Sequence, residues 1–176
     1  MTDLIRIANC SGYYGDKLSA AKEMVEGGPI DVLTGDYLAE LTMTILFNQR
    51  MQRGEDKGYV GTFLKQIKEI AHTCKSKNIK VVTNAGGLNP QSMANEIEKI
   101  LAELKIDLKV AYITGDDLMP RMENLIQLNE PFNNIDKGTP LQESDCHTLT
   151  ANAYLGAWGI KAVSYTHLRA HETSEN

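Results

Sequence analysis

The sequence lacks the features by which membrane and nucleic-acid-binding proteins are recognised. Among its 176 residues there is no run of about 18 apolar residues, which argues against a membrane-spanning helix. The formal net charge is −5, so no excess of lysine and arginine is present to neutralise a phosphate backbone. The first residues enter a strand-like pattern at once, without a signal peptide. We therefore predict a cytoplasmic protein with neither membrane nor nucleic-acid partners.

Paired cysteines and nucleotide motifs are also lacking. Cys10, Cys74 and Cys146 are far apart and odd in number, so we expect reduced thiols and no zinc site. The loop that contains Gly12 and Gly15 has neither a G-x-G-x-x-G motif nor the Lys-Ser/Thr pair of a P-loop, which favours a plain turn over a nucleotide site. Metal and cofactor requirements stay open.

Short β-like segments alternate with longer helical patterns along the chain. Strands are predicted at 4–8, 30–33, 80–83 and 108–113, and helices at 17–26, 37–53, 60–77, 89–104, 119–128 and 145–162. Residues 129–144 are rich in Asn, Pro and Gly and are expected to be irregular. Since helices between strands favour parallel pairing, we predict an α/β fold with a mostly parallel open sheet and helices on both faces.

The last fourteen residues, 163–176, do not continue this pattern. Residues 163–173 match the peptide encoded by one frame of a common transposase sequencing adapter, and the helical spacing before them ends without a cap signal. We therefore predict a partial α/β domain at 1–162, truncated at its C-terminus, and a non-native tail at 163–176. A natural tail rich in Thr and His is the alternative.

Each predicted strand is followed by a loop of glycine or polar residues. The carboxyl ends of parallel strands share one edge of a sheet, and ligands usually bind there. We therefore expect five polar side chains from these loops to converge on one cleft: Asn9, Asp16, Asp36, Asn84 and Asp116.

Asp36 and Asp116 are the predicted catalytic residues, since a carboxylate serves as an acid, a base or a ligand of a hard metal ion. Both precede predicted helices, so N-capping alone is the alternative for each. Substrate-binding roles are predicted for Asn9, Asp16, Asn84, Gly86, Gly87 and Asp117.

Two of these assignments have a plain structural alternative. The amides of Gly86 and Gly87 lead into a helix and would hold a phosphate or carboxylate, unless they only form a turn. Cys10 lies in the first loop, where a nucleophile is one interpretation and a small buried thiol is the other.

Several long segments resemble the acyclic terpene utilisation (AtuA) family. They occur in the family's order, at 7–21, 27–42, 82–90, 115–118 and 151–158, and the resemblance spans the chain up to residue 162. The family is linked to the breakdown of acyclic terpenes such as citronellol and geraniol, and of related branched acids. The resemblance carries over no catalytic residue.

The resemblance implies a protein of acyclic terpene or branched-acid catabolism. We expect the full-length protein to be an enzyme that binds a small acid or acyl thioester at the carboxyl edge of the sheet, with lyase or hydratase chemistry as a guess. The alternative is a non-catalytic subunit or binding module for a partner enzyme of the same pathway. A pocket that joins the loops would favour the enzyme, and an apolar helix face away from them would favour the binding module. The fragment alone is expected to be inactive.

Overall fold

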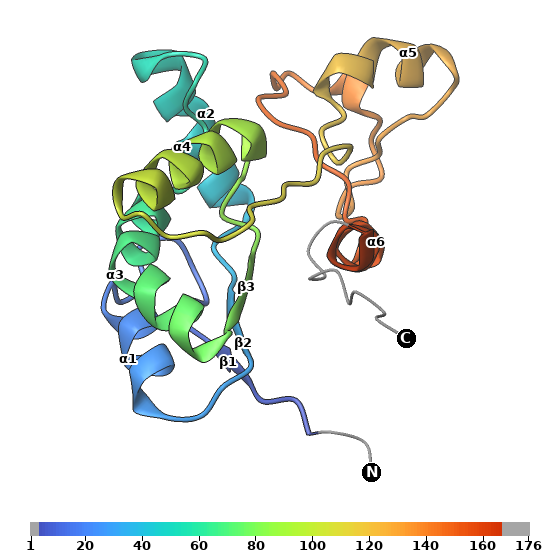
Figure 1. The fold of residues 1–176 in the computed structure, drawn as a ribbon. Coiled ribbons are helices and arrows are strands. Elements are labelled where there is room, and N and C mark those ends of the chain that lie inside the picture. Colours follow the sequence, from blue (N-terminus) through green and yellow to red (C-terminus); the bar gives the residue numbers. More distant parts are fainter. Residues whose placement is uncertain (1–3, 167–176) are drawn as a thin grey trace. The chain divides into compact units, whose positions relative to one another are not determined.

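A computed structural model describes residues 4–166 of the chain (Figure 1). The described residues form two compact units, of which the first holds residues 4–113 together with residues 157–166. The second unit holds residues 114–156. Within residues 4–166, no helix has both the length and the apolar character that a membrane crossing requires.

The first unit is built on a three-stranded parallel sheet. Its strands, in the spatial order β1-β2-β3, are β1 (Ile7–Asn9), β2 (Val32–Gly35) and β3 (Lys80–Thr83). Leu33 lies opposite Ala8 on one side and Val81 on the other, and Gly35 lies opposite Thr83. The sheet confirms the predicted α/β fold with a parallel open sheet, and β3 has the predicted bounds.

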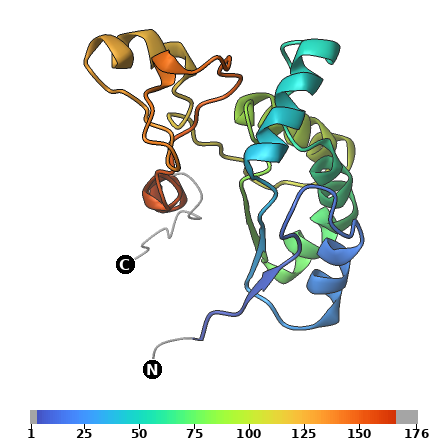
Figure 2. The ribbon, with the colours of Figure 1, turned by 180° about the vertical axis from the view of Figure 1, so that it is seen from behind.

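Helices pack against this sheet. The four helices in the chain up to residue 113 are α1 (Ala20–Gly27), α2 (Glu40–Arg53), α3 (Gly61–Lys77) and α4 (Pro90–Glu103). In both views α1, α3 and α4 lie on the same side of the sheet (Figures 1 and 2). Leu33 is fully buried beneath them and Ala8 and Val81 pack on the same core, whereas Ile7 on the opposite face is 66% exposed.

The predicted strand at 108–113 is wrong, because these residues form no strand in the structure. Leu108 and Val110 pack on the hydrophobic core, while Lys109 and Ala111 between and beside them are exposed. The alternating pattern therefore arises because one side of this segment is buried, and not because the segment pairs with a strand. Periodicity alone does not supply the backbone partner that a strand needs.

The predicted helix at 145–162 is also wrong over residues 145–157. Helix α6 begins only at Trp158 and runs to Thr166. Upstream of it, the amide of Leu118 donates to the carbonyl of Ala151 at 2.8 Å, and the amide of Ala153 donates to the carbonyl of Asp116 at 2.8 Å. Backbone groups that are engaged in this antiparallel contact are not free for helical hydrogen bonds.

The rest of the second unit follows the predicted irregular character. The helix predicted at 119–128 is a short 3-10 turn, η1 (Met119–Arg121), followed by α5 (Met122–Gln127). Residues 129–144 contain turns and one short 3-10 helix, η2 (Leu141–Glu143), but no α-helix or strand. Helix α6 continues past residue 162, and residues 167–176 of the predicted tail lie outside the described residues.

Candidate functional site

The loops after β2 and β3 meet through the side chain of Asn84. Its Oδ1 accepts a hydrogen bond from the amide of Tyr37 at 2.8 Å. Its Nδ2 donates to Oδ1 of Asp36 at 2.6 Å. Because Gly35 and Thr83 are neighbours in the parallel ladder, the residues that follow them lie next to each other at the carboxyl edge. The amide group thus uses both its acceptor and a donor on one neighbouring loop.

The loop after β1 joins the same network through the carbonyl of Ser11. That carbonyl accepts hydrogen bonds from the amide of Asp36 at 3.0 Å and from Nδ2 of Asn9 at 2.9 Å. Oδ1 of Asn9 in turn accepts from the hydroxyl of Thr34 at 3.2 Å. The structure therefore brings together Asn9, Asp36 and Asn84, which the sequence predicted to converge.

The Asp36 carboxylate is held on one oxygen and open on the other. Its Oδ1 accepts from Asn84 and, at 3.4 Å, from the amide of Leu38. No hydrogen bond from residues 4–166 reaches its Oδ2, and the residue is exposed. Helix α2 begins at Glu40 with Ala39 at its N-cap, so Asp36 does not cap this helix. The alternative prediction for Asp36, that it only caps the following helix, is therefore wrong.

The Asp16 carboxylate accepts hydrogen bonds from backbone amides of its own loop. One carboxylate oxygen accepts from the amide of Gly12 at 3.0 Å and the other accepts from the amide of Lys17 at 2.7 Å. These two backbone hydrogen bonds lower the pKa of Asp16 below its usual value, since they favour the charged form. Both oxygens are thus used within the loop that follows β1.

Gly86 and Gly87 form a packed turn. The amide of Gly87 donates to the carbonyl of Asn84 at 3.1 Å, and the amide of Asn89 donates to the carbonyl of Gly86 at 2.9 Å. Gly87 has a φ of +52°, and a Cβ there would lie 2.4 Å from Cδ1 of Leu46. The amide of Gly87 is therefore not free for a ligand in this structure, which supports the turn interpretation. Asn89 caps α4 through a hydrogen bond from the amide of Ser92.

Asp116 and Asp117 lie in the second unit, beside Asn152. Nδ2 of Asn152 donates to Oδ2 of Asp116 at 3.1 Å, and Oδ1 of Asp117 accepts from the amide of Met119 at 2.9 Å. Oδ1 of Asn152 is buried without a hydrogen-bond partner among the described residues. The pair is a second polar cluster, and its participation in the same site as Asp36 stays a prediction.

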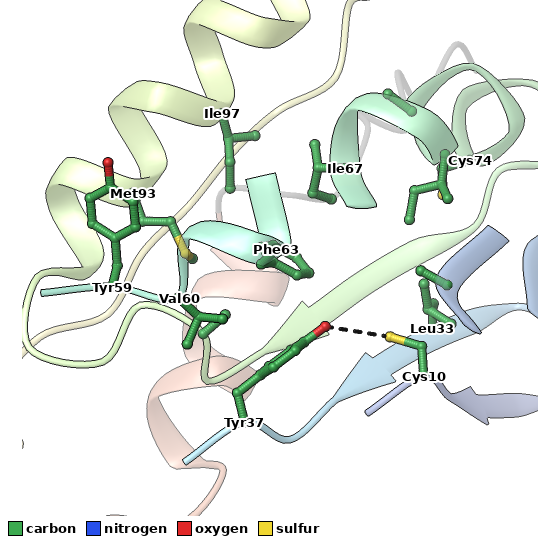
Figure 3. Close-up of a cluster of buried hydrophobic side chains, with 14 of the residues drawn as sticks. Cys10, Leu33, Tyr37, Tyr59, Val60, Phe63, Ile67, Cys74, Met93 and Ile97 are labelled. Atoms are coloured by element: carbon green, nitrogen blue, oxygen red, sulfur yellow. Dashed lines mark hydrogen bonds between the residues drawn. The ribbon is translucent and has the colours of Figure 1, made fainter. Parts of the chain in front are cut away.

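A buried polar chain lies under the edge. The hydroxyl of Tyr37 donates to Oε1 of Gln66 at 2.6 Å, and its oxygen lies 3.8 Å from Sγ of Cys10 (Figure 3). Burial raises the pKa of the Cys10 thiol and of the Tyr37 phenol above their usual values. A buried thiol with a raised pKa is a poor nucleophile, so the structure supports the buried-thiol interpretation of Cys10.

The sequence analysis predicts no role for the buried ring of Tyr37, and it does not name Gln66. A signal for Gln66 was present, because it lies on the same helical face as Phe63, Ile67 and Ile70. A polar residue within an apolar stripe needs a buried partner. Such a partner is most often found on another element, here the loop after β2.

Two surface hollows are lined by residues outside the loops that follow β1, β2 and β3. One of about 470 Å³ lies in the second unit and is lined by residues that include Ile126, Pro131 and Pro140. The other, of about 410 Å³, is lined by residues that include Arg6 and Lys77, near the amino ends of β1 and β2. Asp36 at the carboxyl edge is exposed, and it lines neither of these hollows. Among residues 4–166, no group of three or more His, Cys, Asp or Glu side chains is placed to hold a metal ion.

A comparison with protein families gives one match. The family model described as acyclic terpene utilisation family protein AtuA matches residues 5–163. Neither a curated protein nor a solved structure matches the chain.

Proposed function

The chain belongs to the acyclic terpene utilisation family AtuA, and on this basis we propose that it is the enzyme domain of a protein that breaks down acyclic terpenes or branched acids. Its substrates would be acyl thioesters or small acids in the pathways that consume compounds such as citronellol and geraniol. They would bind at the carboxyl edge of the sheet, where Asn9, Asp36 and Asn84 meet.

The observation that carries this proposal is the asymmetry of the Asp36 carboxylate. An amide donor from Asn84 fixes one oxygen, and the second oxygen faces solvent without a partner among the described residues. A general base needs a carboxylate that is oriented by its neighbours and accessible to the proton that it removes. A lyase or hydratase acting on an acyl thioester requires such a group, and Asp36 is the carboxylate that this edge offers.

The charge of the edge favours the thioester over the free acid. Asp36 is exposed, and the groups bonded around it are the neutral side chains and backbone of Asn9, Ser11 and Asn84. No lysine or arginine takes part in these hydrogen bonds, so a substrate carboxylate would meet a like charge without compensation. A thioester carbonyl or a hydroxyl is neutral and avoids this repulsion. The Asn84 and Asn9 amides supply donors and acceptors for such groups.

A substrate screen on the protein tests the proposal. Thioesters of citronellic acid and of geranic acid would be assayed for turnover with the unmodified protein and the Asp36→Asn variant. Each assay would be run with and without divalent metal ions. We expect turnover to fall by roughly 100- to 10,000-fold in the variant, at an unchanged melting temperature. Asp107→Asn is the matched control, because the Asp107 side chain is exposed and makes no hydrogen bond in the described structure.

The outcomes separate the two candidate roles. Full turnover by Asp36→Asn would contradict the proposed role of Asp36 as the general base. Thioester binding without turnover by the unmodified protein would favour the alternative, a non-catalytic subunit or binding module for a partner enzyme.

A further inference from the structure

Tyr37 connects the hydrophobic core to the polar edge. Its ring is buried, with 3% of the residue exposed, while its backbone amide takes part in the network of Asp36 and Asn84. The ring packs directly against the preceding backbone, since a Cβ on Gly35 would lie 2.7 Å from Cε2 of Tyr37. A single residue thus has one end in the core and the other beside the candidate carboxylate.

The ring end of Tyr37 is held in one position by its hydrogen bonds. The hydroxyl donates to Oε1 of the buried Gln66 at 2.6 Å, and Nε2 of Gln66 donates to the carbonyl of Leu18 at 3.3 Å. Because a phenol has one hydrogen, the Cys10 thiol must be the donor in its 3.8 Å contact with the same oxygen. Phe63 adds an edge-on ring contact with centroids 5.8 Å apart. A buried network in which each group has a partner favours one arrangement.

The backbone end of Tyr37 selects the orientation of the Asn84 amide. The N–H of Tyr37 needs an acceptor, which is Oδ1 of Asn84. With the oxygen turned to Tyr37, the NH₂ group faces the Asp36 carboxylate. A flipped amide would set two N–H groups against each other at Tyr37 and two oxygens against each other at Asp36. The orientation of the donor to Asp36 therefore depends on where Tyr37 holds its amide.

We propose that Tyr37 is a positioning residue, which orients the Asp36 carboxylate through Asn84. The hydrogen bond to Gln66 fixes the ring, the ring fixes the backbone after β2, and the backbone amide fixes the Asn84 side chain. The importance of this for catalysis rests on the proposed role of Asp36. The geometric link from Tyr37 to Asn84 does not depend on that role, so it can be tested without any substrate.

The side-chain NH₂ resonances of Asn84 report this link directly. In the unmodified protein, the NH₂ pair in a ¹⁵N–¹H spectrum should move when Asp36→Asn removes the carboxylate, because the two groups are 2.6 Å apart. In Tyr37→Phe we expect the pair to shift and to lose this response to Asp36→Asn. Tyr59→Phe is the matched control, since Tyr59 is also buried but its hydroxyl makes no hydrogen bond with residues 4–166.

The side chain of Asn89 serves as an internal reference for general disturbance. Its Nδ2 donates to the carbonyl of Glu55 at 3.0 Å, in a turn that does not include Tyr37. A change at Asn84 with no change at Asn89 supports the positioning role. If both amides change together, the effect is a loss of structure and the proposal is overturned. An unchanged Asn84 pair in Tyr37→Phe overturns it as well, and leaves the proposed role of Asp36 standing.

A double variant keeps the test decisive if Tyr37→Phe fails to fold. Tyr37→Phe alone leaves Oε1 of the buried Gln66 without a donor. The double variant, Tyr37→Phe with Gln66→Leu, removes both partners of this hydrogen bond and should be better tolerated. The hydroxyl link is absent in both, so the same change at Asn84 is expected. An Asn84 pair that still responds to Asp36→Asn as it does in the presence of Tyr37 would overturn the proposal.

Discussion

The side chain of Asn84 donates to the carboxylate of Asp36 at 2.6 Å across a separation of 48 residues in sequence. The parallel pairing of β2 and β3 produces this contact, because each residue directly follows the last residue of its strand. The contact fixes one oxygen of Asp36 and leaves the other open. On this relationship we base the proposal that the carboxyl edge is the site of the chain's chemistry.

Replacing Asn84 with alanine should weaken the protein modestly. The amide of Tyr37 loses its acceptor, and the lost hydrogen bonds correspond to about 1–2 kcal/mol of unfolding free energy. Urea unfolding measures this change. Asn48→Ala is the control, because Asn48 is exposed on α2 and makes no side-chain hydrogen bond in the described structure. Equal stability of the two variants would show that the Asn84 bonds contribute nothing measurable.

Replacing Gly87 with alanine should be clearly destabilising. The new Cβ would lie 2.4 Å from Cδ1 of Leu46 and 2.9 Å from the carbonyl oxygen of Gly58, at a φ of +52° that alanine rarely adopts. We expect a loss of roughly 1–3 kcal/mol from strain and overpacking. Gly27→Ala, where a Cβ meets nothing within 4 Å, should leave thermal unfolding almost unchanged. A neutral Gly87→Ala variant would argue against the packed turn.

The ion pair of Arg6 and Asp31 makes stability depend on pH in the acid range. Hydrogen bonds from Arg6 lower the pKa of Asp31 from 3.8 to about 2. Because the folded pKa is depressed, the contribution of Asp31 is present above pH 3.8 and is lost as the pH falls toward 2. The difference in unfolding free energy between the unmodified protein and Asp31→Asn should therefore shrink over this range. The pair is partly exposed, so added salt should weaken it.

Asp116 is the second predicted catalytic carboxylate, and a conservative substitution tests it. Asp116→Asn keeps an oxygen that can accept the hydrogen bond from Asn152, so folding should be retained. If Asp116 takes part in the reaction, turnover should fall by roughly 100-fold or more. Asp136→Asn is the control in the same unit, since its side chain is exposed and accepts no hydrogen bond in the described structure. Turnover equal to that of the control would remove Asp116 from the catalytic set.

Much of the first unit is predictable from local patterns. The bounds of β3 follow from its short β-like run, and the meeting of Asn9, Asp36 and Asn84 follows from the shared carboxyl edge of a parallel sheet. The packing of Gly87 against Leu46 was not predictable, because glycine in a turn signals backbone freedom and not which side chain fills the space.

The errors have one physical cause. Residues 108–113 and 145–157 carry patterns typical of a strand and a helix, yet their structure is decided by partners far away in the chain. Residues 151–153 are held extended by hydrogen bonds to Asp116 and Leu118, which no local spacing reveals. The link from Gln66 to Tyr37 is missed for the same reason.

Mapping the binding site of a thioester tests the central claim most directly. Citronellyl-coenzyme A would be titrated into the ¹⁵N-labelled protein, and the shifts of the backbone amides would be followed. We predict movement at residues 9–12, 36–38 and 84, around the Asp36–Asn84 contact. Movement confined to the hollow near Ile126 and Pro140, or to the one near Arg6 and Lys77, with a silent carboxyl edge, would contradict the account.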